Sequence, residues 1–235
     1  MKRMLIVVIL AILFLSTIGL AAKKKPCAAS LAKCPIIGCG GDFDKGLNRR
    51  KNIRSDDHAP VKRSIQWMKD RPDPKNYVKN GSRAELATLG EGSMIVVVAK
   101  ALVARKGSAE SCNCGLTAPK DTDNHIVMVD PSLETPTLAA DEDESETAEF
   151  TPRVRLDHPN LAGTKLQALI KNAEGNALLV RVTGLLMFDS EHFLGRHLKR
   201  HNNWEIHPVM KLEFCETGND CKLGSDAGWK SLDEQ

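Results

Sequence analysis

Two long stretches that alternate apolar and polar residues, at 177–188 and 204–214, constrain the fold of this chain more than any other feature. A period of two places successive side chains on opposite faces of a strand, so each stretch predicts a β-strand with one buried face. The residues expected in the core are Val182, Leu186, Ile206 and Leu212. Gly184 and Pro208 interrupt the two stretches and predict a bulge or a sheet edge.

Three further strands are expected at residues 94–105, 125–129 and 150–156, and a helix between Asn160 and Gly175. The order strand, strand, strand, helix, strand, strand is found in OB-fold barrels. The predicted fold class is therefore mainly β: a small five-stranded OB-like barrel with a helix between strands 3 and 4 and an irregular, cysteine-containing N-terminal extension. Another small barrel or a sandwich is the alternative. The acidic tract at 141–146 is expected to be a solvated loop.

A basic start, an apolar run and small residues at its end make residues 1–22 a predicted secretory signal peptide. An uncleaved anchor is the alternative, but the apolar run is shorter than the roughly 20 residues that a bilayer requires. We expect a secreted or periplasmic product with no stable membrane anchor after cleavage. The remaining chain divides into a basic extension at 23–83, the barrel domain at 84–221 and a tail at 222–235.

The chain has 7 cysteines, all of them after the predicted signal peptide. An oxidising compartment favours disulfides, and an odd number leaves one thiol free, although the sequence alone does not give the pairing. Cys215 and Cys221 are close enough in sequence to enclose a short loop. A bridge between Cys112 and Cys114 would be strained, so each is expected to pair elsewhere or to stay free.

The chain has 33 Lys and Arg and 30 Asp and Glu, and the predicted signal peptide removes Lys2 and Arg3. The remaining net charge of about +1 gives no general attraction to nucleic acid. Aromatic residues on which bases would stack are also scarce, at 4%, so nucleic acid is an unlikely partner. A local positive patch nevertheless predicts anion binding. Its candidate binding residues are Arg196, Lys199 and Arg200.

In an OB barrel, the loops after the first and fourth strands flank one binding face. Here these loops hold the candidate metal ligands Cys112, Cys114, His192, His197 and His201. Sulfur and imidazole are ligands that zinc accepts, so the sequence offers zinc as a candidate cofactor. The alternative is that the cysteines form disulfides and the histidines are polar loop residues.

His207 and Glu205 share the polar face of the last predicted strand, beside the histidine-containing loop. A histidine and a carboxylate can act as a general base and its orienting partner, which makes them candidate catalytic residues, or they can be a surface pair. The sequence has no recognisable nucleophile elbow and no glycine-rich phosphate loop. We expect a secreted binding or interaction module with an undetermined ligand; the alternative is a metal-dependent hydrolase, such as a nuclease, that uses residues 189–207.

Four short motifs distinguish the chain further. They are Cys34-Pro-Ile-Ile-Gly-Cys-Gly-Gly, Glu110-Ser-Cys-Asn-Cys, Asp189-Ser-Glu-His192 and Trp204-Glu-Ile-His-Pro-Val209. With them the chain resembles a group of secreted bacterial proteins that has no assigned activity. The resemblance covers most of the chain after the signal peptide. It implies secretion, and it assigns no functional residue.

Overall fold

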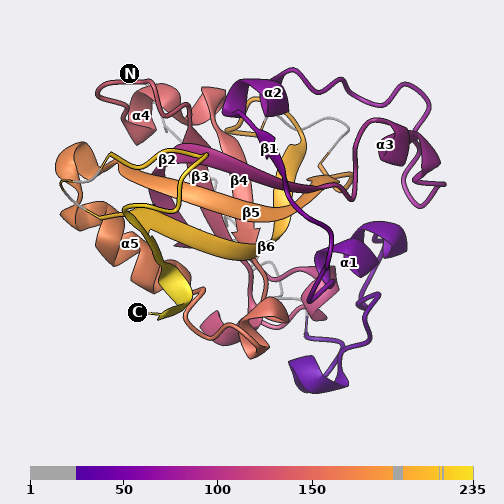
Figure 1. The fold of residues 1–235 in the computed structure, drawn as a ribbon. Coiled ribbons are helices and arrows are strands. Elements are labelled where there is room, and N and C mark those ends of the chain that lie inside the picture. Colours follow the sequence, from indigo (N-terminus) through magenta and orange to yellow (C-terminus); the bar gives the residue numbers. More distant parts are fainter. Residues whose placement is uncertain (1–24, 193–197, 217, 219, 235) are drawn as a thin grey trace, which may run out of the picture.

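The computed structural model describes residues 25–192, 198–216, 218 and 220–234. Five strands close into a barrel around one core (Figure 1). They are β2 (Met94–Lys106), β3 (Asn124–Val129), β4 (Glu146–Phe150), β5 (Leu178–Phe188) and β6 (Trp204–Cys215). The order is β2-β3-β4-β6-β5, and β5 pairs back to β2. Helix α5 (Gly163–Asn172) lies between β4 and β5 in the chain, which confirms the predicted OB-like fold class.

Shorter elements extend this barrel. β1 (Val61–Arg63) adds to β2 in parallel, and β7 (Trp229–Ser231) adds to β6 antiparallel. The remaining α-helices are α1 (Lys45–Lys51), α2 (Ile65–Lys69), α3 (Ala84–Thr88) and α4 (Leu138–Asp141). Single 3₁₀ turns occupy Leu31–Lys33, Ser111–Asn113, Pro119–Asp121, Glu142–Glu144, Val154–Leu156, Glu174–Asn176 and Leu232–Glu234. Figure 1 shows α5 on one side of the barrel and α1 and α3 on the opposite side.

The core and its bulge agree with the sequence-based prediction. Val182, Leu186, Ile206 and Leu212 are all fully buried. The pairing of β5 with β6 shifts register on both sides of Gly184, which is opposite Val209. A Cβ atom on Gly184 would lie 2.4 Å from the carbonyl oxygen of Pro208. The two strands approach so closely here that only glycine fits without a shift of the backbone.

Two expectations about β4 were wrong. The third barrel strand is Glu146–Phe150, and Val154–Leu156 is a 3₁₀ turn. The acidic tract is also not a solvated loop, because Glu142, Ser145 and Glu146 are buried and Glu142–Glu144 is a 3₁₀ turn. Pairing with β3 on one side and β6 on the other decides this, since tertiary contacts override the weak strand propensity of glutamate.

The expectation of a solvent-exposed polar face along β6 was wrong for Glu205, His207 and Glu213, which are buried. Glu205 and His207 are both fully buried, whereas Lys211, further along the same face, is exposed. Helix α1 contacts β6 and the turn at Ser111–Asn113, so an N-terminal element covers this end of the barrel. Glu205 and His207 therefore face an enclosed cluster.

Three disulfides hold the chain together. Cys27 pairs with Cys39, Cys34 with Cys114, and Cys215 with Cys221 as the short spacing suggested, while Cys112 carries a free, buried thiol. The bridge from Cys34 to Cys114 spans 80 residues. It ties the N-terminal extension to the loop after β2, and so helps to hold α1 against the barrel.

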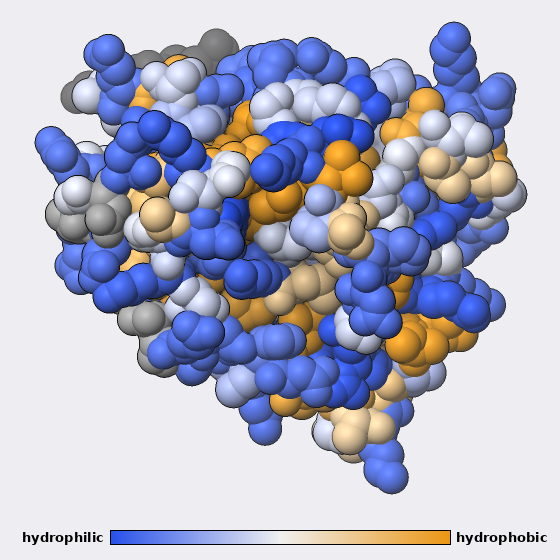
Figure 2. Space-filling model, viewed as in Figure 1, coloured by the Kyte–Doolittle hydropathy of each residue, from blue (hydrophilic) through white to orange (hydrophobic). Residues whose placement is uncertain are grey.

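The surface of the face shown in Figure 2 is mostly hydrophilic, with an apolar area in its middle surrounded by polar side chains. None of the helices that the structure describes is both long enough and apolar enough to cross a membrane.

Candidate functional site

A cluster of buried polar side chains lies at the end of the barrel that α1 covers. Residues two apart on a strand share a face, which places Asp123 beside His125 and Glu205 beside His207. Across the sheet, His125 of β3 pairs with Glu149 of β4. The parallel pairing of β4 with β6 then brings Glu149 next to His207. Glu149 is therefore flanked by a histidine on each side.

His207 is the fully buried histidine of this cluster. Its Nδ1 lies 3.1 Å from Glu205 Oε1, with which it hydrogen-bonds, and 3.2 Å from Glu149 Oε2. Its Nε2 is 3.9 Å from Asp123 Oδ2 and has no hydrogen-bond partner in the described residues. Donation from Nδ1 to Glu205 would leave the Nε2 lone pair of a neutral imidazole directed at Asp123.

His125 lies nearer the surface. Its Nε2 is 3.4 Å from Glu149 Oε1 and 3.7 Å from Glu110 Oε1. The second oxygen of Glu110 accepts a hydrogen bond from Lys51 Nζ of α1, at 2.8 Å. Glu110, His125 and Glu149 line a cavity of about 350 Å³ that opens to solvent. The cluster therefore has a buried part and a part that solutes reach.

Negative charge exceeds positive charge in this cluster. Its carboxylates are Glu110, Asp123, Glu149, Asp189 and Glu205. Its permanent cations are Lys51 and Arg200, so the five carboxylates exceed them by three when the histidines are neutral. An uncompensated buried charge is strongly destabilising, so protons or bound cations have to balance this excess.

The pKa values respond to this crowding. Burial raises the pKa of Glu149 to about 7, although the two histidines oppose it. Burial, together with the charge of Glu110, also raises the pKa of Asp123. The charge of Glu149 raises the pKa of His125 to about 9. Without a bound cation, the cluster therefore retains protons that a metal ion would displace.

The donor atoms are spaced as metal ligands. One donor atom from each of Asp123, Glu149 and His207 lies within 4.8 Å of the others, and the same holds for Glu110, His125 and Glu149. Carboxylate and imidazole together suit first-row transition metals such as zinc and manganese. Glu110, Cys112 and Asp123 form a third such trio. A fourth, of sulfur atoms from Cys27, Cys39 and Cys114, belongs to disulfides and offers no thiolate.

Of the metal ligands predicted from sequence, the structure places Cys112 in this cluster and His192 at the edge of the cavity that the cluster borders. Cys112 Sγ is 3.4 Å from Glu110 Oε2 and 3.8 Å from Asp123 Oδ2, and burial raises the pKa of its thiol. Cys114 is in a disulfide and is therefore removed from the ligand set. His192 binds Asp189, a carboxylate of the cluster, whereas His201 binds Glu144 outside it. His197 lies outside the described residues.

The predicted anion-binding residues have separate environments. The side chain of Arg200 is only 7% exposed, and its guanidinium binds Asp189 Oδ2 and Glu205 Oε2, each at 2.7 Å. It therefore stabilises the cluster and has little capacity left for a ligand. Lys199 is exposed at the rim of the cavity. Arg196 lies outside the described residues.

The prediction that Glu205 and His207 lie beside each other is confirmed. The sequence did not, however, identify most of the cluster. Glu110, Asp123, His125 and Glu149 come from three separate segments of the chain. The pattern Asp123-Asn-His125 at the start of a strand was the available signal, because it puts a carboxylate and an imidazole on one face. Glu149 gave no such signal, since it stands next to an acidic tract that resembles a loop.

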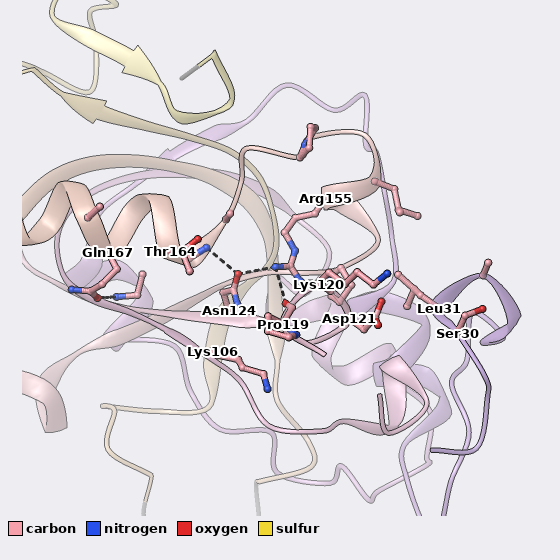
Figure 3. Close-up of a pocket in the computed structure, with 18 of the residues that line it drawn as sticks. Ser30, Leu31, Lys106, Pro119, Lys120, Asp121, Asn124, Arg155, Thr164 and Gln167 are labelled. Atoms are coloured by element: carbon pink, nitrogen blue, oxygen red, sulfur yellow. Dashed lines mark hydrogen bonds between the residues drawn. The ribbon is translucent and has the colours of Figure 1, made fainter. Parts of the chain in front are cut away.

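A larger cavity of about 860 Å³ lies beside α5 (Figure 3). Its polar groups join α5 to the barrel. Asn124 Oδ1 accepts hydrogen bonds from the backbone N–H of Gly163 and from Arg155, both at 2.9 Å, and Gln167 Oε1 accepts from the N–H of Ala104 at 2.8 Å. These hydrogen bonds attach α5 to β2 and β3 at the wall of the cavity.

No protein-family model, curated protein or solved structure matches this chain. The geometry of the polar cluster therefore carries the functional assignment.

Proposed function

We propose that this protein is a binding module for a divalent transition-metal ion, held by Asp123, Glu149 and His207. The observation that carries the proposal is the fully buried Nε2 atom of His207, which lacks a hydrogen-bond partner in the described residues and lies 3.9 Å from a carboxylate oxygen. A buried polar atom without a partner costs about 1–3 kcal/mol, and a coordinated cation would satisfy it.

Two further features support a metal site. The cluster has an excess of carboxylates, which a divalent cation would neutralise. In addition, Glu205 holds His207 by its second ring nitrogen, at 3.1 Å. A carboxylate behind a histidine fixes the tautomer of a metal-ligating imidazole and increases its basicity, and this arrangement is found at most histidine metal sites.

Isothermal titration calorimetry of the disulfide-bonded protein with Zn²⁺ and Mn²⁺, together with metal analysis, tests this proposal. We expect saturable binding that Asp123→Asn weakens by at least tenfold, because the substitution replaces a charged ligand with a neutral amide. His201→Ala is the matched control, since His201 binds Glu144 at the surface and stands outside the cluster. Absence of saturable binding for both metals would remove the proposal.

A second candidate function is a metal-dependent hydrolase, which includes a nuclease. The observation that favours it is the cavity of about 350 Å³ that reaches Glu149 and His125, with Lys199 at its rim. A bound metal supplies an activated water or polarises the scissile group, and the cavity leaves room for a substrate. Metal-dependent hydrolysis of bis(p-nitrophenyl) phosphate or single-stranded DNA, lost in Glu149→Gln, would establish catalysis.

We also propose that the protein is exported and processed near Ala22. The three disulfides support this, because such bridges persist in oxidising compartments. Intact-mass measurement of the purified protein tests the processing. Recovery of the full-length chain from the membrane fraction would instead identify an uncleaved anchor.

A further inference from the structure

We infer that the cluster binds two cations and that the carboxylate of Glu149 bridges them. This inference rests on the proposed function, because it concerns the number of metal ions in the same site. The inner cation would be held by Asp123, Glu149 and His207, and the outer cation by Glu110, His125 and Glu149.

The position of Glu149 between the two histidines supports a bridge. Its Oε1 is 3.4 Å from His125 Nε2, whereas its Oε2 is 3.2 Å from His207 Nδ1. Each oxygen therefore faces a different histidine ring. On the inner side Oε2 lies nearest Nδ1, the nitrogen that also binds Glu205, and Glu149 joins the inner trio because one of its donor atoms lies within 4.8 Å of those of Asp123 and His207. The side chain is 5% exposed, and its Oε2 has no hydrogen-bond partner in the described part of the chain. A bridging carboxylate uses both oxygens in this way, and two-metal sites with ions about 3.5–4 Å apart are common in hydrolytic enzymes.

Each half of the cluster also has an unpartnered imidazole nitrogen. His125 Nε2 and His207 Nε2 are both buried at the atom level and both lack a hydrogen-bond partner among the described residues. A single cation near one histidine would leave the other nitrogen unsatisfied. The absence of a side chain at Gly107 leaves the outer position open, because a Cβ atom on Gly107 would lie 2.9 Å from His125 Nε2.

The two positions differ in access. The side chain of His125 is 31% exposed and borders the cavity, whereas that of His207 is 0% exposed. The outer cation is therefore the one that exchanges readily and that a ligand in the cavity would contact. The inner cation would be exchanged more slowly, since no part of His207 reaches solvent.

Metal stoichiometry and electron paramagnetic resonance of the disulfide-bonded protein loaded with Mn²⁺ test this inference. We expect two Mn²⁺ per chain and an exchange-coupled spectrum. His125→Ala is expected to retain one Mn²⁺ with an uncoupled spectrum. Glu110→Gln, which alters the outer position through another ligand, should weaken the second binding event by tenfold or more. Circular dichroism confirms that each variant is folded.

The outcomes separate this inference from the proposed function. One Mn²⁺ in the wild-type protein would overturn the two-cation site and leave the proposed metal-binding function intact. Two Mn²⁺ without exchange coupling would overturn the Glu149 bridge. No bound metal with either Mn²⁺ or Zn²⁺ would overturn both proposals.

Discussion

Glu149 and His207 face each other across the parallel pairing of β4 with β6, with Glu149 Oε2 3.2 Å from His207 Nδ1. On its other side, β4 pairs with β3 and sets Glu149 against His125. One carboxylate thus contacts imidazoles from two neighbouring strands. Parallel pairing of the third and fifth barrel strands therefore builds the centre of the candidate site from residues that are far apart in the sequence.

Replacement of Glu205 with glutamine should weaken Zn²⁺ binding by about 10–100-fold. Glu205 accepts the hydrogen bond from His207 Nδ1, at 3.1 Å, and a neutral amide holds and polarises the imidazole less strongly. The dissociation constant of the folded variant, measured by calorimetry, gives the effect.

Asp189→Asn is the matched control for this substitution. Arg200 binds Asp189 and Glu205 at the same distance, 2.7 Å, so each variant weakens one buried ion pair of Arg200. Asp189 is not paired with His207 in the structure. Zn²⁺ affinity should therefore stay within a few-fold of wild type in Asp189→Asn, and an equal loss in both variants would show that Arg200, not His207, transmits the effect.

His192 should make a pH-dependent contribution to stability. Its Nδ1 lies 2.6 Å from Asp189 Oδ2, and this hydrogen bond raises the pKa of His192 although partial burial and the nearby Lys51 and Arg200 oppose it. Because the folded pKa exceeds the unfolded value of about 6.5, the stabilisation is complete below about pH 6.5 and is lost as the pH rises through the folded pKa.

Urea denaturation of wild type and His192→Gln at a series of pH values measures this contribution. The difference in the free energy of unfolding should favour wild type at acidic pH and shrink as the pH rises. A difference that does not change with pH would mean that a charged His192 gains nothing from Asp189 in the folded protein.

The disulfide between Cys34 and Cys114 should stabilise the fold more than the one between Cys215 and Cys221. The first spans 80 residues and the second spans 6. Because loop-closure entropy grows with length, removal of each pair by double alanine substitution should lower the free energy of unfolding by roughly 4 and 2 kcal/mol, respectively. Denaturant titration of the two double variants measures both losses. A larger loss of stability on removal of the Cys215–Cys221 disulfide would contradict the entropic argument.

Truncation of Leu186 to alanine should lower the free energy of unfolding by roughly 2–4 kcal/mol, because it leaves a cavity in the fully buried barrel core. Lys211→Ala, at an exposed position of the adjacent strand, should change it by no more than about 0.5 kcal/mol. Chemical denaturation measures both. Similar values for the two variants would contradict the assigned core.

Local pattern was sufficient to predict β2, β3, β5 and β6 and the core residues of the last two. The alternation in β5 and β6 identified Val182, Leu186, Ile206 and Leu212 as core, and Gly184 as a bulge, because a period of two and a missing side chain are properties of the sequence itself. The order of elements then predicted the barrel. The short spacing of Cys215 and Cys221 likewise indicated their disulfide.

The polar cluster depended on the tertiary structure. The alternation predicted that Glu205 and His207 lie on a solvent-exposed face. Nothing in the local sequence shows that α1 covers that end of the barrel. The sequence placed Glu149 next to a predicted acidic loop. It gave no strand signal there, because pairing with β3 and β6, and not intrinsic propensity, makes β4 a strand. Alternation determines which residues share a face, but only the pairing of distant strands decides which faces meet and which of them are buried.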